Sequence, residues 1–129
     1  MEIKFSNDTV VHAVVVTQDI TEAAIESIMV GAIEGGINYW GYVLPASKTG
    51  KPAEEPTSTW CAYQLLQGKD IFIGDVEDDE EEWTLTKEKL FEGIQRNFTQ
   101  YNRTDIDEYD AEDYDRIIQC ALFGKMVFG

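Results

Sequence analysis

The sequence predicts a single α+β domain in which an antiparallel β-sheet carries about three α-helices on one side. The chain has 129 residues, a length typical of one domain, so residues 1–129 are treated as one folding unit. Three stretches repeat apolar residues with the period of a helix buried on one face. Around them lie short stretches rich in β-branched and aromatic residues, which are typical of strands.

Two short β-strands are expected before the first helix. Glu2–Phe5 alternates polar and apolar residues, and Thr9–Thr17 (TVVHAVVVT) is dense in β-branched residues. Ser6–Asp8 has the composition of a turn between them. His12, the only histidine, lies inside the valine run, so we expect a structural role for it.

The first helix and the segment after it are expected to form the unit on which the core packs. Apolar residues recur at helical spacing over Ile25–Ile33, and Asp19 with Glu22 can form a capping box before them. The pair Gly35-Gly36 should end this helix, because a residue after the C-terminus commonly needs positive φ. Asn38–Tyr42 (NYWGY) then has the aromatic composition of a strand.

The middle of the chain is expected to hold a hairpin between two exposed loops. Pro45–Pro56 contains all three prolines and little to bury, which is typical of a surface loop. Thr57–Leu66 and Ile71–Ile73 are interpreted as strands joined by a turn. Asp75–Glu82 has seven carboxylates in eight positions, which predicts a second exposed loop. The spacing of calcium ligands is missing from it, so no metal site is expected.

Two further helices are expected in the last third of the chain. Thr86 can cap Lys87–Thr99 and Asp110 can cap Ala111–Phe123, because each side-chain oxygen can accept a hydrogen bond from a free helix N–H group. Both segments repeat apolar residues at helical spacing. The polar stretch Tyr101–Tyr109 should be the loop between them.

The chain end is expected to return to the sheet. Gly124 should end the last helix, and Lys125–Phe128 (KMVF) is interpreted as a short final strand. The resulting order of elements, β-β-α-β-β-β-α-α-β, favours an antiparallel sheet with helices on one side.

Composition restricts the partners and the location. The 25 acidic and 10 basic residues give a net charge of −15, which disfavours non-specific nucleic-acid binding because that depends on cations neutralising phosphates. No apolar run reaches the ~18 residues of a membrane span, and no signal-peptide pattern is present, so we expect a cytoplasmic protein. Cys61 and Cys120 lie in apolar contexts and are expected to be buried free thiols.

The sequence lacks the usual signatures of catalysis. No glycine-rich loop precedes a helix to hold phosphate, and no cysteines and histidines have the spacing of metal ligands. No nucleophile has an obvious base beside it. We therefore expect neither an enzyme nor a cofactor or metal.

A nucleotide-binding site is easier to assemble from these residues. Aromatic rings can stack on a base, arginine forks suit phosphate, and amides can bind a base edge or a ribose hydroxyl. Residues 5–47 contain no Lys or Arg, whereas three arginines lie in the C-terminal third. The candidate ligand-binding residues are Tyr39, Trp40, Phe91, Arg96, Asn97, Asn102, Arg103, Asp115, Arg116 and Gln119. Each aromatic is also compatible with the core, and each arginine with a solvated surface.

Several motifs resemble those of small phage proteins. A helix leads into EGGINYW (Glu34–Trp40), Leu85-Thr86 starts a helix with Gly93-Ile94 further on, and the last helix ends in IIQCALFG (Ile117–Gly124). The whole chain resembles the first Thoeris anti-defence family of phage proteins, the signal "sponges".

The resemblance implies a binding protein without enzymatic activity. Members of that family sequester glyco-cyclic ADP-ribose, a signal made by bacterial TIR-domain sensors, so that the downstream effector is never activated. Some members hold cyclic di- or trinucleotides at separate sites. The family forms homo-oligomers with ligand pockets near the subunit interfaces. The implied location is the cytoplasm of the infected bacterial host.

A protein that imitates DNA is the alternative, with a restriction or CRISPR nuclease as its target. An acidic surface can occupy a nucleic-acid site through its carboxylates. The acids that favour this alternative are Asp75–Glu82 together with Asp105, Asp107, Glu108, Asp110, Glu112, Asp113 and Asp115. The two hypotheses differ in which substitutions should abolish function: arginine and aromatic residues for the sponge, and carboxylates for the DNA mimic.

Overall fold

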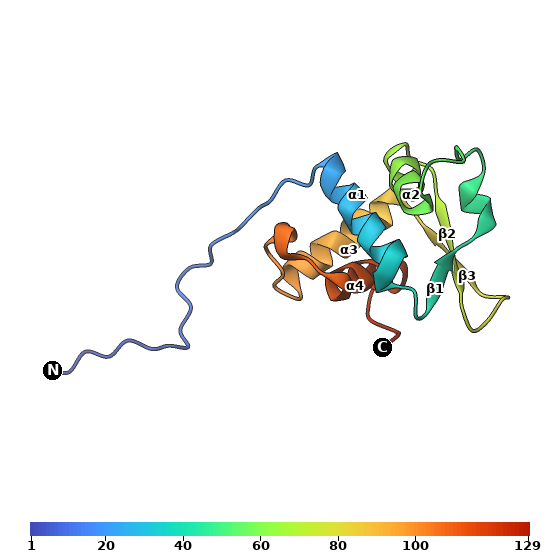
Figure 1. Ribbon diagram of the computed structural model, residues 1–129. Helices are drawn as coiled ribbons and strands as arrows, with labels where there is room; N and C mark the ends of the chain where they lie inside the picture. The colour runs from blue at the N-terminus through green and yellow to red at the C-terminus, as the bar shows by residue number, and fades with distance from the viewer.

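The computed structural model describes residues 1–129 and confirms an α+β domain, with four α-helices and one three-stranded antiparallel sheet. Figure 1 shows the sheet at one end of the molecule, α1, α3 and α4 grouped beside it, and a long N-terminal segment that leads away from both. The elements are α1 (Glu22–Gly31), η1 (Ala32–Gly36, a π-helix), β1 (Gly41–Val43), η2 (Pro45–Lys48), α2 (Thr57–Leu66), β2 (Ile71–Asp75), β3 (Glu82–Leu85), α3 (Lys87–Thr99), η3 (Ile106–Glu108) and α4 (Ala111–Phe123).

The sheet has the order β1-β2-β3, with both pairs antiparallel. Ile73 in the central strand lies opposite Val43 on one side and Trp83 on the other. One face of the sheet contributes to a core of 19 buried hydrophobic residues, which also draws on all four α-helices. Burial of this apolar surface is the main source of the domain's stability.

The two C-terminal helices have the predicted bounds. The Thr86 hydroxyl accepts a hydrogen bond from the Lys89 N–H at 3.1 Å, which caps α3. Asp110 caps α4 in a capping box with Asp113, and Gly124 follows the helix with a φ of 74°. These ends were predictable because capping is a local interaction between residues a few positions apart.

The first helix begins differently from the prediction and ends with a different backbone geometry. Its N-cap is Thr21, whose Oγ1 accepts from the Ala24 N–H at 3.1 Å, and not Asp19. The helical segment does end at the predicted glycine pair, because the π-helix η1 follows α1 and runs to Gly36, but neither Gly35 nor Gly36 has the positive φ expected there. Gly36 is needed for another reason: a Cβ there would lie 3.0 Å from the Ala111 carbonyl oxygen, at the start of α4.

Thr57–Leu66 forms the helix α2 and not the predicted strand, so the expected hairpin with Ile71–Ile73 does not exist. Ser58, Cys61, Ala62 and Leu65 are its buried residues, and their i, i+3, i+4, i+7 spacing is that of one helix face. The aromatic residues of this segment favoured a strand, but tertiary packing overrides such weak propensities.

The N-terminal strands predicted at Glu2–Phe5 and Thr9–Thr17 are absent. Residues 1–20 are exposed and form no helix or strand, as the blue segment of Figure 1 shows. His12 is exposed with them, so its predicted structural role in a strand is not borne out. We call residues 1–20 the N-terminal arm.

Other strand predictions are corrected in part. Asn38–Tyr42 contributes to β1 only from Gly41, and Lys125–Phe128 forms no strand. The loop Pro45–Pro56 is largely exposed but contains η2 and the buried Ser47, whose Oγ accepts from the Phe72 N–H at 2.7 Å.

The acidic segment and both cysteines agree largely with expectation. Val76–Glu82 is exposed and connects β2 with β3, although Asp75 and Glu82 themselves belong to the strands. Cys61 and Cys120 are buried free thiols, as predicted. Burial raises the pKa of the Cys61 thiol to about 11, which makes it unreactive near neutral pH.

Candidate functional site

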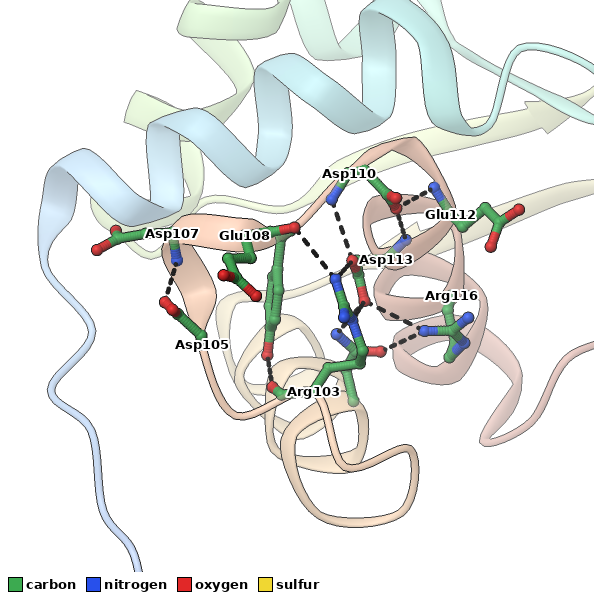
Figure 2. Close-up of polar contacts among 10 residues, drawn as sticks. Arg103, Asp105, Asp107, Glu108, Asp110, Glu112, Asp113 and Arg116 are labelled. Carbon is green, nitrogen blue, oxygen red and sulfur yellow. Dashed lines mark hydrogen bonds and ion pairs between the residues drawn. The ribbon is translucent and has the colours of Figure 1, made fainter.

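Asp113, at the N-terminal end of α4, is the centre of a polar cluster between α3 and the loop that follows it. Its carboxylate is only 2% exposed and accepts hydrogen bonds on both oxygens (Figure 2). The donors are Arg103 Nε and Nη2 at 2.8 Å each, the Asp110 N–H at 3.0 Å, Asn97 Nδ2 at 3.1 Å and Arg116 Nη1 at 3.2 Å.

The local sequence explains how this carboxylate is held. Asp110 and Asp113 are three residues apart, and each side chain accepts a hydrogen bond from the backbone N–H of the other. Desolvation alone would raise the pKa of Asp113, but hydrogen bonds from Arg103, Asp110 and Asn97 outweigh it and lower the pKa to about 2. Asp113 is therefore ionised at neutral pH in spite of its burial.

Arg103 directs both groups of its side-on fork, Nε and Nη2, at the Asp113 carboxylate. Nη2 also donates to the Glu108 carbonyl oxygen at 3.1 Å. The hydrogen bond to Asp113 raises the pKa of Arg103. This arginine thus fixes the loop between α3 and α4 against the start of α4.

Arg116 is held differently, and its fork stays free. Nη1 donates to Asn97 Oδ1 at 2.8 Å and to Asp113, and both dashed lines that reach Arg116 in Figure 2 end at this one nitrogen. Nε and Nη2 make no hydrogen bond within the protein, and neither is a buried atom. The guanidinium carbon lies 4.7 Å from the centre of the exposed Tyr101 ring. Nη1 of Arg116 is therefore anchored, whereas Nε and Nη2 have no partner within the protein, on a side chain that is 19% exposed.

A second network joins four of the other predicted site residues in the interior. The Asp115 carboxylate accepts from Tyr39 Oη at 2.6 Å, from Trp40 Nε1 at 2.8 Å and from Gln119 Nε2 at 2.8 Å. Burial, followed by the hydrogen bond to Asp115, raises the pKa of the Tyr39 hydroxyl to about 12. Gln119 Oε1 in turn accepts the backbone N–H groups of residues 127 and 128, both at 2.8 Å. This network fixes the C-terminal segment onto α4.

Trp40 lies in the core and has no open face. It is 2% exposed, and its indole stacks on the Phe128 ring with centroids 4.9 Å apart. Trp83 and Phe123 contact it from other directions. Trp40 is therefore a core residue, which the sequence also allowed, whereas the Tyr39 ring is half exposed.

Three predicted site residues lie apart from both networks. Arg96 donates to the Gly124 carbonyl oxygen at 2.7 Å and to Glu92 Oε1 at 3.0 Å, so it closes the C-terminal end of α4. Phe91 is partly exposed on α3. Asn102 is exposed and has a φ of 55°, in the left-handed region that asparagine tolerates.

The structure thus divides the predicted residues into two groups. Asn97, Arg103 and Arg116 meet at Asp113, whereas Tyr39, Trp40, Asp115 and Gln119 meet in the interior. The sequence did not identify Asp113 or Tyr101 as part of a nucleotide-binding site, although Asp113 is among the acids that favour the DNA-mimic alternative. The Asp110-x-x-Asp113 spacing is a local signal for the former, but nothing in the sequence places the Tyr101 ring against Arg116.

Exposed carboxylates border the Asp113 cluster. They are Asp105, Asp107, Glu108, Asp110 and Glu112 (Figure 2). A second exposed acidic group occupies the loop between β2 and β3. Among the 25 acidic residues only Glu92 and Asp113 take part in ion pairs, so the surface field is strongly negative around the two arginines.

Two of the surface grooves are prominent, and no Lys or Arg lines either of them. The larger, of about 610 Å³, lies between the N-terminal arm and α3, and the smaller, of about 380 Å³, lies beside Trp60 and Tyr63 on α2. No group of three or more His, Cys, Asp or Glu side chains is arranged to hold a metal ion. No helix has both the length and the apolar character needed to cross a membrane.

Comparisons with known proteins give no relative: no family model matches the chain, and no curated protein or solved structure matches it significantly.

Proposed function

We propose that this protein binds a phosphate-bearing nucleotide signal and sequesters it without cleaving it, in the cytoplasm of an infected bacterium. The resemblance to the first Thoeris anti-defence family suggests glyco-cyclic ADP-ribose as the ligand, with cyclic di- or trinucleotides as further candidates. The observation that carries the proposal is that the side-on edge of Arg116, Nε and Nη2, has no hydrogen-bond partner within the protein, on a side chain that is 19% exposed.

This edge suits a phosphate. Two parallel N–H groups on a planar guanidinium match two oxygens of a phosphate and bind it bidentately. Asn97 and Asp113 already hold Nη1, so little side-chain entropy is lost when a ligand binds. Arg103 also pairs with Asp113, so two guanidinium groups face the one buried carboxylate of the cluster, and the neighbouring Asp110 carboxylate balances the second positive charge.

Tyr101 adds a contact for the base. Its ring is 39% exposed and lies against the Arg116 guanidinium, so an adenine could stack beside the bound phosphate. A base stacked on an aromatic side chain contributes about 1–3 kcal/mol. Tyr101 therefore replaces the buried Trp40 as the proposed ring on which a base stacks.

The energies indicate that one chain supplies only part of the affinity. Each charge-assisted hydrogen bond contributes about 1.5–3 kcal/mol, so one fork and one stacked base together give about 4–9 kcal/mol. Nanomolar affinity needs about −12 kcal/mol. A tight sponge therefore requires further contacts, and a second copy of the chain could supply them.

The direct test is calorimetry of the purified protein with glyco-cyclic ADP-ribose. Arg116→Ala should weaken binding by ~2 kcal/mol or more, about 30-fold, because it removes a charged hydrogen-bond donor. Arg116→Lys should restore only part of it, since lysine keeps the charge but loses the fork. Arg96→Ala is the matched control, because Arg96 pairs with Glu92 and Gly124 at a different place.

The ligand released by heating should be intact by chromatography. Absence of binding to the wild-type protein would reject the proposed ligand. Cleaved ligand would show an enzyme. Equal affinity of wild type and Arg116→Ala would remove Arg116 from the site.

A second candidate function is favoured by the unpaired carboxylates. We propose as the alternative that the acidic surface occupies the nucleic-acid site of a restriction or CRISPR nuclease. The carboxylates beside η3 and in the loop between β2 and β3 are exposed and form no ion pairs, so they are available to lysines and arginines of a partner. Neutralising Asp105, Asp107 and Glu108 together should then abolish inhibition of the nuclease, and added salt should weaken the complex. The same variant should still bind nucleotide if the first proposal holds.

A further inference from the structure

Two aromatic side chains of α2 lie side by side at the surface of the protein. Trp60 and Tyr63 are three residues apart, so they lie on the same side of the helix. Their ring centroids are 5.8 Å apart, and the ring planes are inclined by 34°. Tyr63 is 52% exposed, and neither ring belongs to the hydrophobic core. Aromatic residues are enriched in surfaces that bind other proteins, so this pair is a candidate contact site.

Trp60 is held in one orientation by the segment that precedes α2. Its Nε1 donates a hydrogen bond to the Ser47 carbonyl oxygen at 3.0 Å. Ser47 is buried, and its Oγ accepts from the Phe72 N–H in β2 at 2.7 Å. The indole is therefore tied to the sheet through η2, while part of the ring stays exposed. A ring fixed in this way loses little side-chain entropy when a ligand binds.

The loop before α2 completes a groove beside the two rings. This smaller groove, of about 380 Å³, is called the α2 groove and is lined by Pro52, Glu55, Thr59, Trp60 and Tyr63. Lys51 Nζ holds the loop, because it donates to the carbonyl oxygens of Pro52 and Glu55 at 3.0 and 2.7 Å. Lys51 does not line the groove, so Glu55 is the only charged residue of the lining. The Glu55 side chain is exposed and forms no ion pair.

The lining of the α2 groove favours a cation. The face of an aromatic ring is negative and attracts a cation that lies within about 6 Å of the ring centre. The unpaired Glu55 carboxylate adds to this attraction and repels a phosphate, so a nucleotide does not suit this groove. The net charge of −15 also draws basic partners to the protein as a whole.

A proline-rich segment suits the α2 groove less well, although aromatic grooves bind such segments in other proteins. The carbonyl groups of a polyproline helix have no internal hydrogen bonds, so a groove that covers them must supply donors. The only side-chain N–H group of the lining is Trp60 Nε1, and Ser47 already uses it.

Among cations, a guanidinium matches the α2 groove best. It is planar, so it stacks on an aromatic face, and it is more weakly hydrated than an ammonium group. Its fork also pairs with both oxygens of a carboxylate. Lysine offers a compact, strongly hydrated charge and no flat face.

We propose that the α2 groove binds an arginine side chain of a basic protein partner. The guanidinium stacks on the surface formed by Trp60 and Tyr63 and pairs with the Glu55 carboxylate. The groove lies at the surface, so the side chain enters it while the partner's backbone stays outside. The site shares no residue with the Asp113 cluster or with the carboxylates of the DNA-mimic alternative, so it is independent of both proposed functions.

The first test is an NMR titration of the isotope-labelled full chain with short peptides. Acetyl-Gly-Arg-Gly-amide should shift the indole N–H resonance of Trp60 in a saturable way. The same peptide with lysine in place of arginine should bind about fivefold more weakly or worse. The peptide with citrulline, which keeps the shape of arginine without its charge, should give no saturable shift.

The second test compares variants with the arginine peptide. Tyr63→Leu and Glu55→Gln should each weaken binding about fivefold or more, because one removes an aromatic face and the other the paired charge. Glu54→Gln is the matched control, since it removes the same charge from the adjacent exposed residue, which does not line the groove. It should leave the affinity unchanged. The substituted side chains are exposed, so all three variants should fold.

Four results would overturn the proposal. No shift of Trp60 with the arginine peptide would exclude arginine from the groove. Equal losses in Glu54→Gln and Glu55→Gln would show attraction by the general negative charge alone. Equal affinity for the lysine peptide would remove the role of the aromatic surface. Tighter binding of a tetraproline peptide would assign the groove to a proline-rich segment.

Discussion

At the scale of single residues, Asp113 organises the polar surface between α3 and α4. Five donors from four residues converge on it, and two of these residues are arginines that would otherwise be solvated. Because a buried carboxylate is costly unless it is paired, removing one partner costs more than the pair contributes. Arg116 is therefore held in place in part by a buried carboxylate.

The low pKa of Asp113 predicts how its contribution to stability depends on pH. Its pKa is about 2 in the folded protein, below its ordinary value of 3.8, so the folded state holds the ionised form more strongly. The contribution, roughly 2 kcal/mol from the size of this shift, is complete above about pH 4 and is lost as the pH falls through about 2.

The comparison of wild type with Asp113→Asn isolates this contribution. The difference between their free energies of unfolding, measured by urea denaturation, should shrink by roughly 2 kcal/mol between about pH 5 and about pH 2. Taking the difference cancels the titration of the other acids. A difference that stays constant over this range would contradict the stabilisation of the Asp113 carboxylate by its donors.

At the scale of elements, the contact between α3 and α4 depends on a glycine. A Cβ at Gly93 would overlap the Ile117 carbonyl oxygen and lie 3.0 Å from the Ala121 Cβ. The two helices can therefore approach closely enough for Asn97 to reach Asp113 and Arg116. The polar cluster exists because the helix backbones are close.

This close approach predicts a contrast between two glycine substitutions. Gly93→Ala should destabilise the protein by about 1–3 kcal/mol, because the helices must move apart. Gly35→Ala is the matched control: a Cβ at Gly35 would meet no atom within 4 Å outside the neighbouring helix backbone, and alanine favours a helical backbone by up to about 1 kcal/mol. Urea denaturation of both variants measures the contrast. Equal effects would mean that the helix contact tolerates a methyl group.

The N-terminal arm and α2 show how elements depend on what surrounds them. Burying one valine side chain contributes about 1.5–3 kcal/mol, and the five exposed valines of the arm lack this contribution. Within one chain nothing is available to cover them. In α2, by contrast, Cys61 and Leu65 are buried in a helix that packs against α1 and β2, so a segment with strand-like composition becomes a helix.

At the scale of the whole molecule, uncompensated charge is the main feature. The net charge is −15, and the structure has only three ion pairs. Repulsion among unpaired carboxylates destabilises the compact state.

This repulsion predicts that salt stabilises the protein. At 0.1 M salt, screening acts over about 10 Å, so Tm should rise by a few degrees as sodium chloride is added at constant pH. A variant with Glu80, Glu81 and Glu82 replaced by glutamine should show a higher Tm at low salt and a smaller rise. Differential scanning calorimetry measures both. A Tm that falls with salt would show that attractive pairs dominate the surface.

The sequence by itself determined the α+β class, the bounds of Lys87–Thr99 and Ala111–Phe123, the exposed acidic loop and the buried thiols. These features follow from helical periodicity, capping residues and charge, which act between residues that are close along the chain. Only the tertiary structure decided that Trp40 is buried against Asp115, that Thr57–Leu66 is a helix, and that the valine-rich arm lacks a partner strand. It also placed Tyr101 and the free edge of Arg116 together. The physical reason is that burial and strand pairing depend on residues that are distant in the sequence. A local pattern shows that a segment is apolar or strand-like, but it does not show which residues pack against it.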